Sequence, residues 1–213
     1  MTAPARTLLI LLCATAIVAC KTEAREGQAG GEILFQNNCA VCHGEDGGGK
    51  ANIKAPAIAG LPQWYASAQL LKFREGARGT DPDDMEGMRM KPMAMTLRND
   101  VEVDAVTTYI ASLKPVPQET TLEGGNAEAG AAKYAVCTAC HGPDGAGNEQ
   151  LKAPPINQMS DWYLLSQLKK FKAGDRGTNP DDLTGQQMRP MAMTLTDEQA
   201  MKDVVAHIKT LGG

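Results

Sequence analysis

Two short stretches of the chain combine cysteine and histidine at a spacing suited to covalent attachment of a cofactor. They read Cys39-Ala40-Val41-Cys42-His43 and Cys137-Thr138-Ala139-Cys140-His141. In each stretch two thiols lie about one helical turn apart and a histidine follows directly. The pattern C-x-x-C-H is the attachment sequence of a c-type haem. A redox dithiol or half of a zinc site are the alternatives for C-x-x-C alone, and the repeated histidine favours haem over both.

The histidines and methionines limit the choice of iron ligands. His43 and His141 are the expected proximal ligands, and the third histidine, His207, matches Tyr109 in the repeat described below and so is a poor candidate. Methionine is then the natural distal ligand, because a neutral thioether suits low-spin haem iron. The repeat keeps three methionine pairs, namely Met90/Met188, Met93/Met191 and Met95/Met193. At most one pair can bind iron, and the other two would line the pockets.

From the first motif onward the chain repeats itself at a constant offset of 98 residues. The cysteines and histidines match, and the match continues without a gap to the segment that ends at Leu97 and Leu195. Such a long match indicates a tandem duplication. Upstream of the motif the second copy lacks one residue, so the two first helices should meet their motifs at different angles. We expect domains at 27–113 and 125–213, with a proline-containing linker at 114–124.

Periodicity within each copy predicts helices and gives no strand signal, so the expected fold class is all-α. The first helices are expected at about 28–38 and 126–136, each leading into a haem motif. The second helices follow Pro62 and Ser160. The last helices should begin at Asn99, with Glu102 three residues on, and at Thr196, with Gln199 three residues on, as in a capping box. The paired acidic residues Asp83-Asp84 and Asp181-Asp182 are expected to be turn or helix-start residues rather than catalytic groups.

The N-terminus is typical of an exported protein. An apolar run from Leu8 to Ala19 follows a single charge at Arg6 and is too short to span a bilayer, so residues 1–19 are predicted to be a signal peptide. The run ends at Ile17-Val18-Ala19-Cys20, which favours lipidation of Cys20 over ordinary cleavage nearby. Residues 20–26 would then form a tether. The formal net charge of −4 gives no indication of nucleic-acid binding.

Each half of the chain resembles a class I cytochrome c, and the tandem pair resembles the dihaem cytochrome c4 family. The resemblance implies a distal methionine in an M-x-P sequence, which selects Met90 and Met188, with Met93 and Met191 as the alternative. It implies a bond from the proximal histidines to the carbonyls of Pro56 and Pro154. Haem propionates could contact Trp64, Trp162, Arg78 and Arg176, although the tryptophans could equally be core residues and the arginines solvated loop charges.

These features predict an electron carrier rather than an enzyme, because a haem with two protein ligands has no open position for a substrate. We expect two covalently attached haem c groups and a periplasmic protein, lipid-anchored to a membrane. The resemblance implies a quinol-oxidising cytochrome bc-type complex as donor and a terminal oxidase or reductase as acceptor. The alternatives are a fixed haem subunit of a membrane-associated dehydrogenase or oxidase complex, and a dihaem peroxidase, against which the similar methionine segments argue.

Overall fold

The computed structural model describes residues 27–211. The predicted signal peptide, Cys20 and the predicted tether 20–26 lie outside these residues. The described part of the chain is built from helices, with only two isolated β-bridges, Lys50 to Ala55 and Asn148 to Ala153. The all-α expectation is therefore confirmed. Among the described helices, none is both long enough and apolar enough to cross a bilayer.

The two copies contain matching sets of helices. In the first copy these are α2 (Gly27–Asn38), α3 (Ala40–His43), the 3-10 turn η1 (Ala51–Ile53), α4 (Gln63–Glu75), α5 (Met85–Met95) and α6 (Asp100–Ser112). In the second copy they are α7 (Ala127–Tyr134), α8 (Thr138–His141), α9 (Asp161–Ala173), α10 (Leu183–Met193) and α11 (Glu198–Thr210). Helix α2 continues to within one residue of Cys39, whereas α7 ends three residues before Cys137. The first helix of the second copy thus ends further from its haem motif than that of the first copy.

The core of each copy lies where its first and last helices cross. Helix α2 packs on α6 and α7 packs on α11. A Cβ atom at Gly31 would lie 2.1 Å from the carbonyl oxygen of Ala105, and one at Gly130 would lie 2.0 Å from that of Asp203. Glycine is required at both positions because the helix backbones touch there. Buried apolar side chains surround the crossings, including Phe35, Val106, Tyr134 and Val205.

The last helices begin at equivalent positions of the repeat, α6 at Asp100 and α11 at Glu198, and the sequence predicted only the first of the two caps. Asn99 caps α6 as predicted, and its side chain accepts a hydrogen bond from the Glu102 backbone N–H at 2.9 Å. In the second copy the prediction of Thr196 as the cap was wrong. Asp197 is the cap, accepting from the Ala200 N–H at 2.8 Å. A carboxylate also interacts favourably with the positive end of the helix dipole, which a threonine hydroxyl cannot match.

Helices α5 and α10 carry the methionines and were not predicted from the sequence, which indicated only three helices per copy. Pro92 and Pro190 lie inside them. Proline normally ends a helix because it lacks an N–H donor. Here the helices begin at strong caps, since Asp84 accepts from the Gly87 N–H and Asp182 accepts from the Gly185 N–H. Both aspartates are helix-start residues, as predicted.

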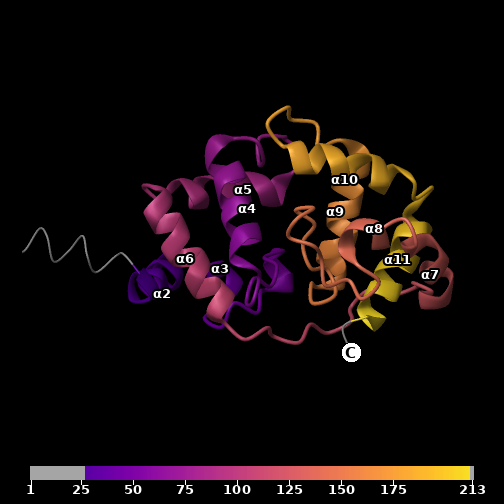
Figure 1. Ribbon diagram of the computed structural model, residues 1–213, viewed down its shortest axis with the longest axis horizontal. Helices are drawn as coiled ribbons and strands as arrows, with labels where there is room; N and C mark the ends of the chain where they lie inside the picture. Colours follow the sequence, from indigo (N-terminus) through magenta and orange to yellow (C-terminus); the bar gives the residue numbers. More distant parts are fainter. Residues whose placement is uncertain (1–26, 212–213) are drawn as a thin grey trace, which may run out of the picture.

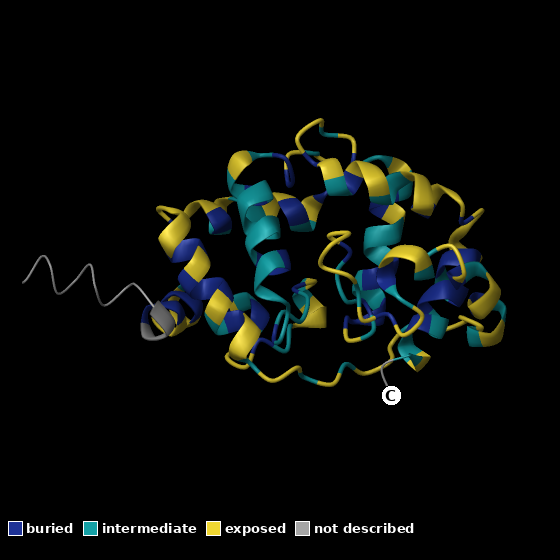
Figure 2. Cartoon of the chain, in the orientation of Figure 1, coloured by how far each residue is buried: buried dark blue, intermediate teal, exposed yellow. Residues whose placement is uncertain are grey.

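The two copies lie side by side, related by an approximate twofold axis (Figure 1). Helices α4 and α9 occupy the middle, α5 and α10 lie along one edge, and the helix pairs α2/α6 and α7/α11 form the two ends. Much of α4 and α9 is only half-buried (Figure 2), since these helices line the pockets described below. The segment between α6 and α7 is extended along the opposite edge, and Asp161 accepts hydrogen bonds from its Thr121 and Leu122 N–H groups.

Candidate haem-binding sites

A large, mainly apolar pocket lies against the C-x-x-C-H motif of each copy. Cys39, Cys42 and His43 line the first pocket, whose volume is about 1440 Å³ when the space open to solvent is counted. Cys137, Cys140 and His141 line the second, of about 1150 Å³ by the same measure. Helices α3 and α8 position these side chains, because each is a single turn that carries the second cysteine and the histidine. Both histidines are buried, whereas Cys140 is exposed.

The two motif histidines are oriented in the same way. The Nδ1 atom of His43 lies 2.7 Å from the carbonyl oxygen of Pro56, and that of His141 lies 2.8 Å from the carbonyl oxygen of Pro154. The contact implied by the family resemblance is thus present in both copies. Burial lowers the pKa of His43 and of His141, although the bond to the proline carbonyl acts in the opposite direction. A neutral ring that donates from Nδ1 leaves its Nε2 lone pair available to a metal.

The methionine pairs differ in where they lie. Met90 and Met93 line the first pocket, and Met188 and Met191 line the second. Met95 and Met193 lie on the surface, with 59% and 53% of their areas exposed. Met191 is 39% exposed, whereas Met188 and Met90 are half-buried. Only the pair Met90/Met188 is therefore partly buried against the pocket in both copies.

The first cysteine of each motif has a raised pKa. Burial, with a smaller contribution from neighbouring Cys42, raises the pKa of Cys39 to about 12. Burial and neighbouring Cys140 raise the pKa of Cys137 to about 11. These thiols are thus protonated at neutral pH, which is unlike the lowered pKa of a reactive redox dithiol. The dithiol alternative loses support on this ground.

Arg78 and Arg176 are buried rather than solvated. Their exposed fractions are 7% and 8%, and each guanidinium stacks on a phenylalanine of its own copy, 4.5 Å from the ring centroid of Phe73 or Phe171. Arg78 lines the first pocket and Arg176 the second, and the Nε of each is buried without a hydrogen-bond partner. A buried cation with an unused donor at the wall of an apolar pocket fits an anionic group such as a haem propionate.

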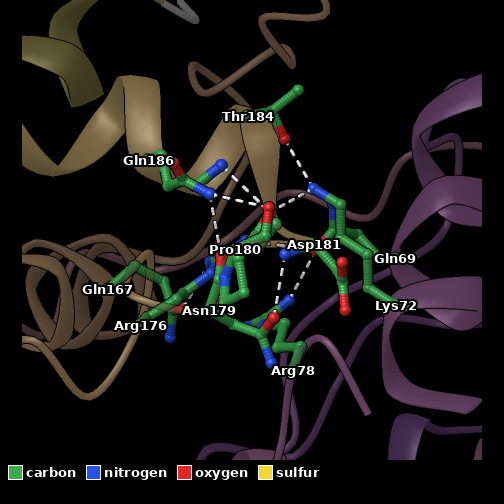
Figure 3. Close-up of polar contacts among 12 residues, drawn as sticks. Gln69, Lys72, Arg78, Gln167, Arg176, Asn179, Pro180, Asp181, Thr184 and Gln186 are labelled. Atoms are coloured by element: carbon green, nitrogen blue, oxygen red, sulfur yellow. Dashed lines mark hydrogen bonds and ion pairs between the residues drawn. The ribbon is translucent and has the colours of Figure 1, made fainter. Parts of the chain in front are cut away.

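Two glutamines join these arginines across the boundary between the copies. The Oε1 atom of Gln69 accepts from Arg78 at 2.8 Å and from Arg176 at 3.1 Å. The Oε1 atom of Gln167 accepts from Arg176 at 2.7 Å and from Arg78 at 3.0 Å. The four side chains thus form a closed ring of four hydrogen bonds that links the two copies. They are among the residues drawn in Figure 3.

Ion pairs reinforce the same boundary. Lys72 contacts Asp182 at 2.5 Å and also donates to Thr184. Its counterpart Lys170 contacts Asp84 at 2.5 Å and also pairs with Glu86. The repeat carried a signal for these residues, because the lysines and glutamines match between the copies at offset 98. The sequence analysis did not single them out, since a match alone does not say which surface a residue faces.

The tryptophans lie across the boundary rather than over the pockets of their own copies. Trp162 lines the first pocket, with the Lys54 ammonium 5.4 Å from its ring centroid. Trp64 packs against the apolar core of the second copy, with the Lys152 ammonium 5.5 Å from its ring centroid. Neither tryptophan therefore lies at the wall of the pocket in its own copy.

The two pockets share part of one wall. Of the residues that the structure describes, five line both pockets, namely Tyr65, Gln69, Met159, Tyr163 and Gln167. They come from α4, from α9 and from the segment just before α9. Groups bound in the two pockets would thus be separated by a single layer of side chains.

Comparison with known proteins now identifies the family. The cytochrome c family model matches residues 28–114 and again residues 127–212. The chain belongs to the cytochrome c family. It is 32% identical over 92% of its length to the "Thiosulfate dehydrogenase electron acceptor" of Stutzerimonas stutzeri (strain A1501), covering 92% of that protein. It is 30% identical to "Cytochrome c4" of Azotobacter vinelandii, over 94% of this chain and 93% of that protein.

The fold agrees with this assignment. The crystal structure of reduced recombinant cytochrome c4 from Pseudomonas stutzeri matches 86% of this chain and 98% of its own, with a TM-score of 0.69 and 25% identity. The chain is thus a tandem cytochrome c of the dihaem cytochrome c4 type. It binds two haem c groups and acts in electron transfer.

Proposed function

We propose that one haem c is attached in each pocket through the motif cysteines. Cys39 and Cys42 would hold the first and Cys137 and Cys140 the second. His43 and Met90 would bind the iron in the first copy, and His141 and Met188 in the second. The observation that carries this proposal is the pairing, in both copies, of a motif histidine held through Nδ1 with a half-buried methionine that lines the same pocket.

The surrounding side chains fit this arrangement. The carbonyls of Pro56 and Pro154 would hold each imidazole with Nε2 toward the iron, and the bond would raise the basicity of the ligand. Arg78 and Arg176 would neutralise propionates through their unpaired Nε donors. A thioether ligand and an apolar wall both favour the reduced state, so the chain's own residues hold the reduction potentials high.

Haem supplies one-electron redox chemistry when bound in these pockets. The protein would carry single electrons between respiratory redox complexes, and the wall shared by the two pockets suits rapid exchange between its own two sites. Export by residues 1–19 and lipidation of Cys20 would place it in the periplasm at a membrane surface. The domains would then be 27–113 and 125–213, joined by the linker 114–124.

Two donors are candidates. The first is a quinol-oxidising cytochrome bc-type complex, with a terminal oxidase or reductase as acceptor. The second is a thiosulfate-oxidising dehydrogenase, which is favoured by the 32% identity with the thiosulfate dehydrogenase electron acceptor of Stutzerimonas stutzeri. In either case the protein is the mobile or tethered carrier, and the donor performs the substrate chemistry.

A stopped-flow experiment tests the carrier function and separates the donors. The oxidised holoprotein is mixed with a thiosulfate dehydrogenase plus thiosulfate, or with a cytochrome bc-type complex plus quinol, and its absorbance is followed. We expect two electrons to enter each chain, at a rate that depends on the concentration of one donor. Uptake of a single electron per chain, or slow reduction by both donors, would contradict the proposal.

A further inference from the structure

The second copy contributes more to the first pocket than the first copy contributes to the second. Six residues of the second copy line the pocket beside His43, namely Met159, Trp162, Tyr163, Ser166, Gln167 and Lys170. Among the described residues of the first copy, only Tyr65 and Gln69 line the pocket beside His141. The duplication has therefore produced two sites with nearly the same ligands but unequal walls.

Trp162 is the largest of the added side chains. Its counterpart in the repeat, Trp64, is not part of the described wall of the second pocket and packs instead against the core of the second copy. The two tryptophans have the same sequence position and the same helix register, at the second residue of α9 and of α4. They thus form a matched pair, of which Trp162 lines the pocket beside His43 and Trp64 does not.

Each tryptophan is held under a lysine from the opposite copy. Lys54 and Lys152 have φ angles of 57° and 54°, in the left-handed region that is uncommon for residues other than glycine. This backbone conformation is kept in both copies, and it directs each ammonium onto a ring across the boundary, at 5.4 Å and 5.5 Å. Lys54 also lines the first pocket, as Lys152 lines the second. Trp162 therefore holds a positive charge at the edge of that pocket.

We propose that Trp162 of the second copy raises the reduction potential of the haem in the first copy. Reduction lowers the charge on the haem by one unit, so water favours the oxidised state, and both an apolar cover and a nearby cation favour the reduced state. Trp162 supplies the cover directly and fixes the position of the Lys54 ammonium. The inference rests on the proposed placement of one haem in each pocket. It makes the first haem's potential depend on docking of the second copy.

The test is a potentiometric titration of the intact holoprotein followed by absorbance. The two steps are first assigned with Met90→His and Met188→His, because replacing a thioether ligand by an imidazole lowers the potential of only the haem that it binds. If neither variant moves a single step, the proposed methionine ligands are wrong. That outcome would contradict the proposed iron ligands but not the proposed role of Trp162, which the comparison of the tryptophan variants tests separately.

The decisive comparison is Trp162→Ala against Trp64→Ala. At a fixed ambient potential, Trp162→Ala should lower the ratio of reduced to oxidised first haem about tenfold, which corresponds to ~59 mV for one electron. Trp64→Ala removes the same side chain from the matching position and should change that ratio less than about twofold. Lys54→Met should shift the first haem in the same direction as Trp162→Ala, whereas Lys152→Met should leave the first haem unchanged.

The proposal is overturned if folded Trp162→Ala leaves the reduction potential of the first haem unchanged, or if Trp64→Ala shifts that potential by the same amount. Circular dichroism establishes whether each variant is folded. If Trp162→Ala does not fold, Trp162→Phe and Lys54→Met decide the matter, since both variants keep a large side chain at the boundary between the two copies. Both must then lower the first potential, and an unchanged potential in both would refute the role of Trp162.

Discussion

The Nζ atom of Lys170 lies 2.5 Å from Oδ1 of Asp84, although the two residues belong to different copies of the repeat. The equivalent pair, Lys72 and Asp182, has the same separation of 2.5 Å. Both aspartates also cap the helix that carries the proposed iron ligand of their own copy. Docking of the two copies is thus linked to the start of the two methionine helices.

Replacing Lys170 should destabilise the protein strongly. In Lys170→Met the buried carboxylate of Asp84 and the neighbouring Glu86 lose their shared cation. Removing one partner of a buried pair costs about 3 kcal/mol of unfolding free energy. The control is Lys169→Met, because Lys169 pairs with Glu198 on the surface at 2.8 Å. That variant should lose less than ~1 kcal/mol in urea unfolding. Equal losses would contradict the importance of the buried pair.

The same ion pairs predict a loss of stability in acid. Burial acts to raise the pKa values of Asp84 and Asp182, but the hydrogen bonds from Lys170 and Lys72, together with the cap bonds, lower both below the usual range. The carboxylates therefore stabilise the folded state above their unfolded pKa of ~3.9, and this contribution is lost as the pH falls through the lower folded values.

Urea unfolding of the wild type and of Asp182→Asn, measured from neutral pH to below pH ~4, checks this prediction. Asparagine keeps the capping oxygen and removes the charge, so the variant should be less stable at neutral pH and should lose less of its remaining stability in acid. Parallel pH profiles for the two proteins would show that Asp182 contributes nothing to the acid sensitivity.

The corrected cap of α11 can be tested by a pair of alanine substitutions. Asp197→Ala should cost about 1 kcal/mol of unfolding free energy, because it removes the acceptor of the Ala200 N–H. Thr196→Ala should cost less than ~0.5 kcal/mol, since the Thr196 side chain is exposed and only contacts Asp197 at 3.3 Å. A larger loss of stability in Thr196→Ala than in Asp197→Ala, measured by thermal or urea unfolding, would instead support the capping box at Thr196 that the sequence predicted.

The helix crossings should not tolerate a methyl group. Gly31→Ala and Gly130→Ala would each push a Cβ atom to about 2 Å from a backbone carbonyl oxygen of the partner helix. We expect each change to cost at least ~2 kcal/mol, because a backbone cannot move aside as a side chain can. Gly124→Ala is the control, since no atom lies within 4 Å of its added Cβ, and its φ of 77° should cost only about 1 kcal/mol. Similar midpoints for all three variants in thermal unfolding would contradict this account of the crossings.

The sequence was most informative where the chemistry depends on short spacings. The haem motifs, the duplication, the all-α class and the Asn99 cap could all be predicted, because each depends on residues close together in the chain or matched at one offset. The histidine contacts to Pro56 and Pro154 were expected from the family resemblance, and they are present at 2.7 and 2.8 Å.

Features that depend on how the copies dock could not be predicted. Trp64 and Trp162 have equivalent sequence positions, and only the packing places Trp162 at the first pocket and Trp64 against the core of the second copy. Arg78 looked equally like a loop charge, and its burial follows from the glutamine pair on the twofold axis. Helices α5 and α10 were missed for a local reason, since Pro92 and Pro190 argue against a helix unless the cap at Asp84 or Asp182 is recognised.

An absorbance spectrum of the purified holoprotein tests the central claim most directly. The account predicts two covalent haems per chain, a weak methionine-to-iron charge-transfer band in the oxidised protein, and no change when carbon monoxide is added to the reduced protein. These results would establish that both irons are closed by His43 or His141 on one face and by a methionine on the other. Binding of carbon monoxide by either haem, or absence of the methionine band, would reveal an open iron and contradict the carrier function.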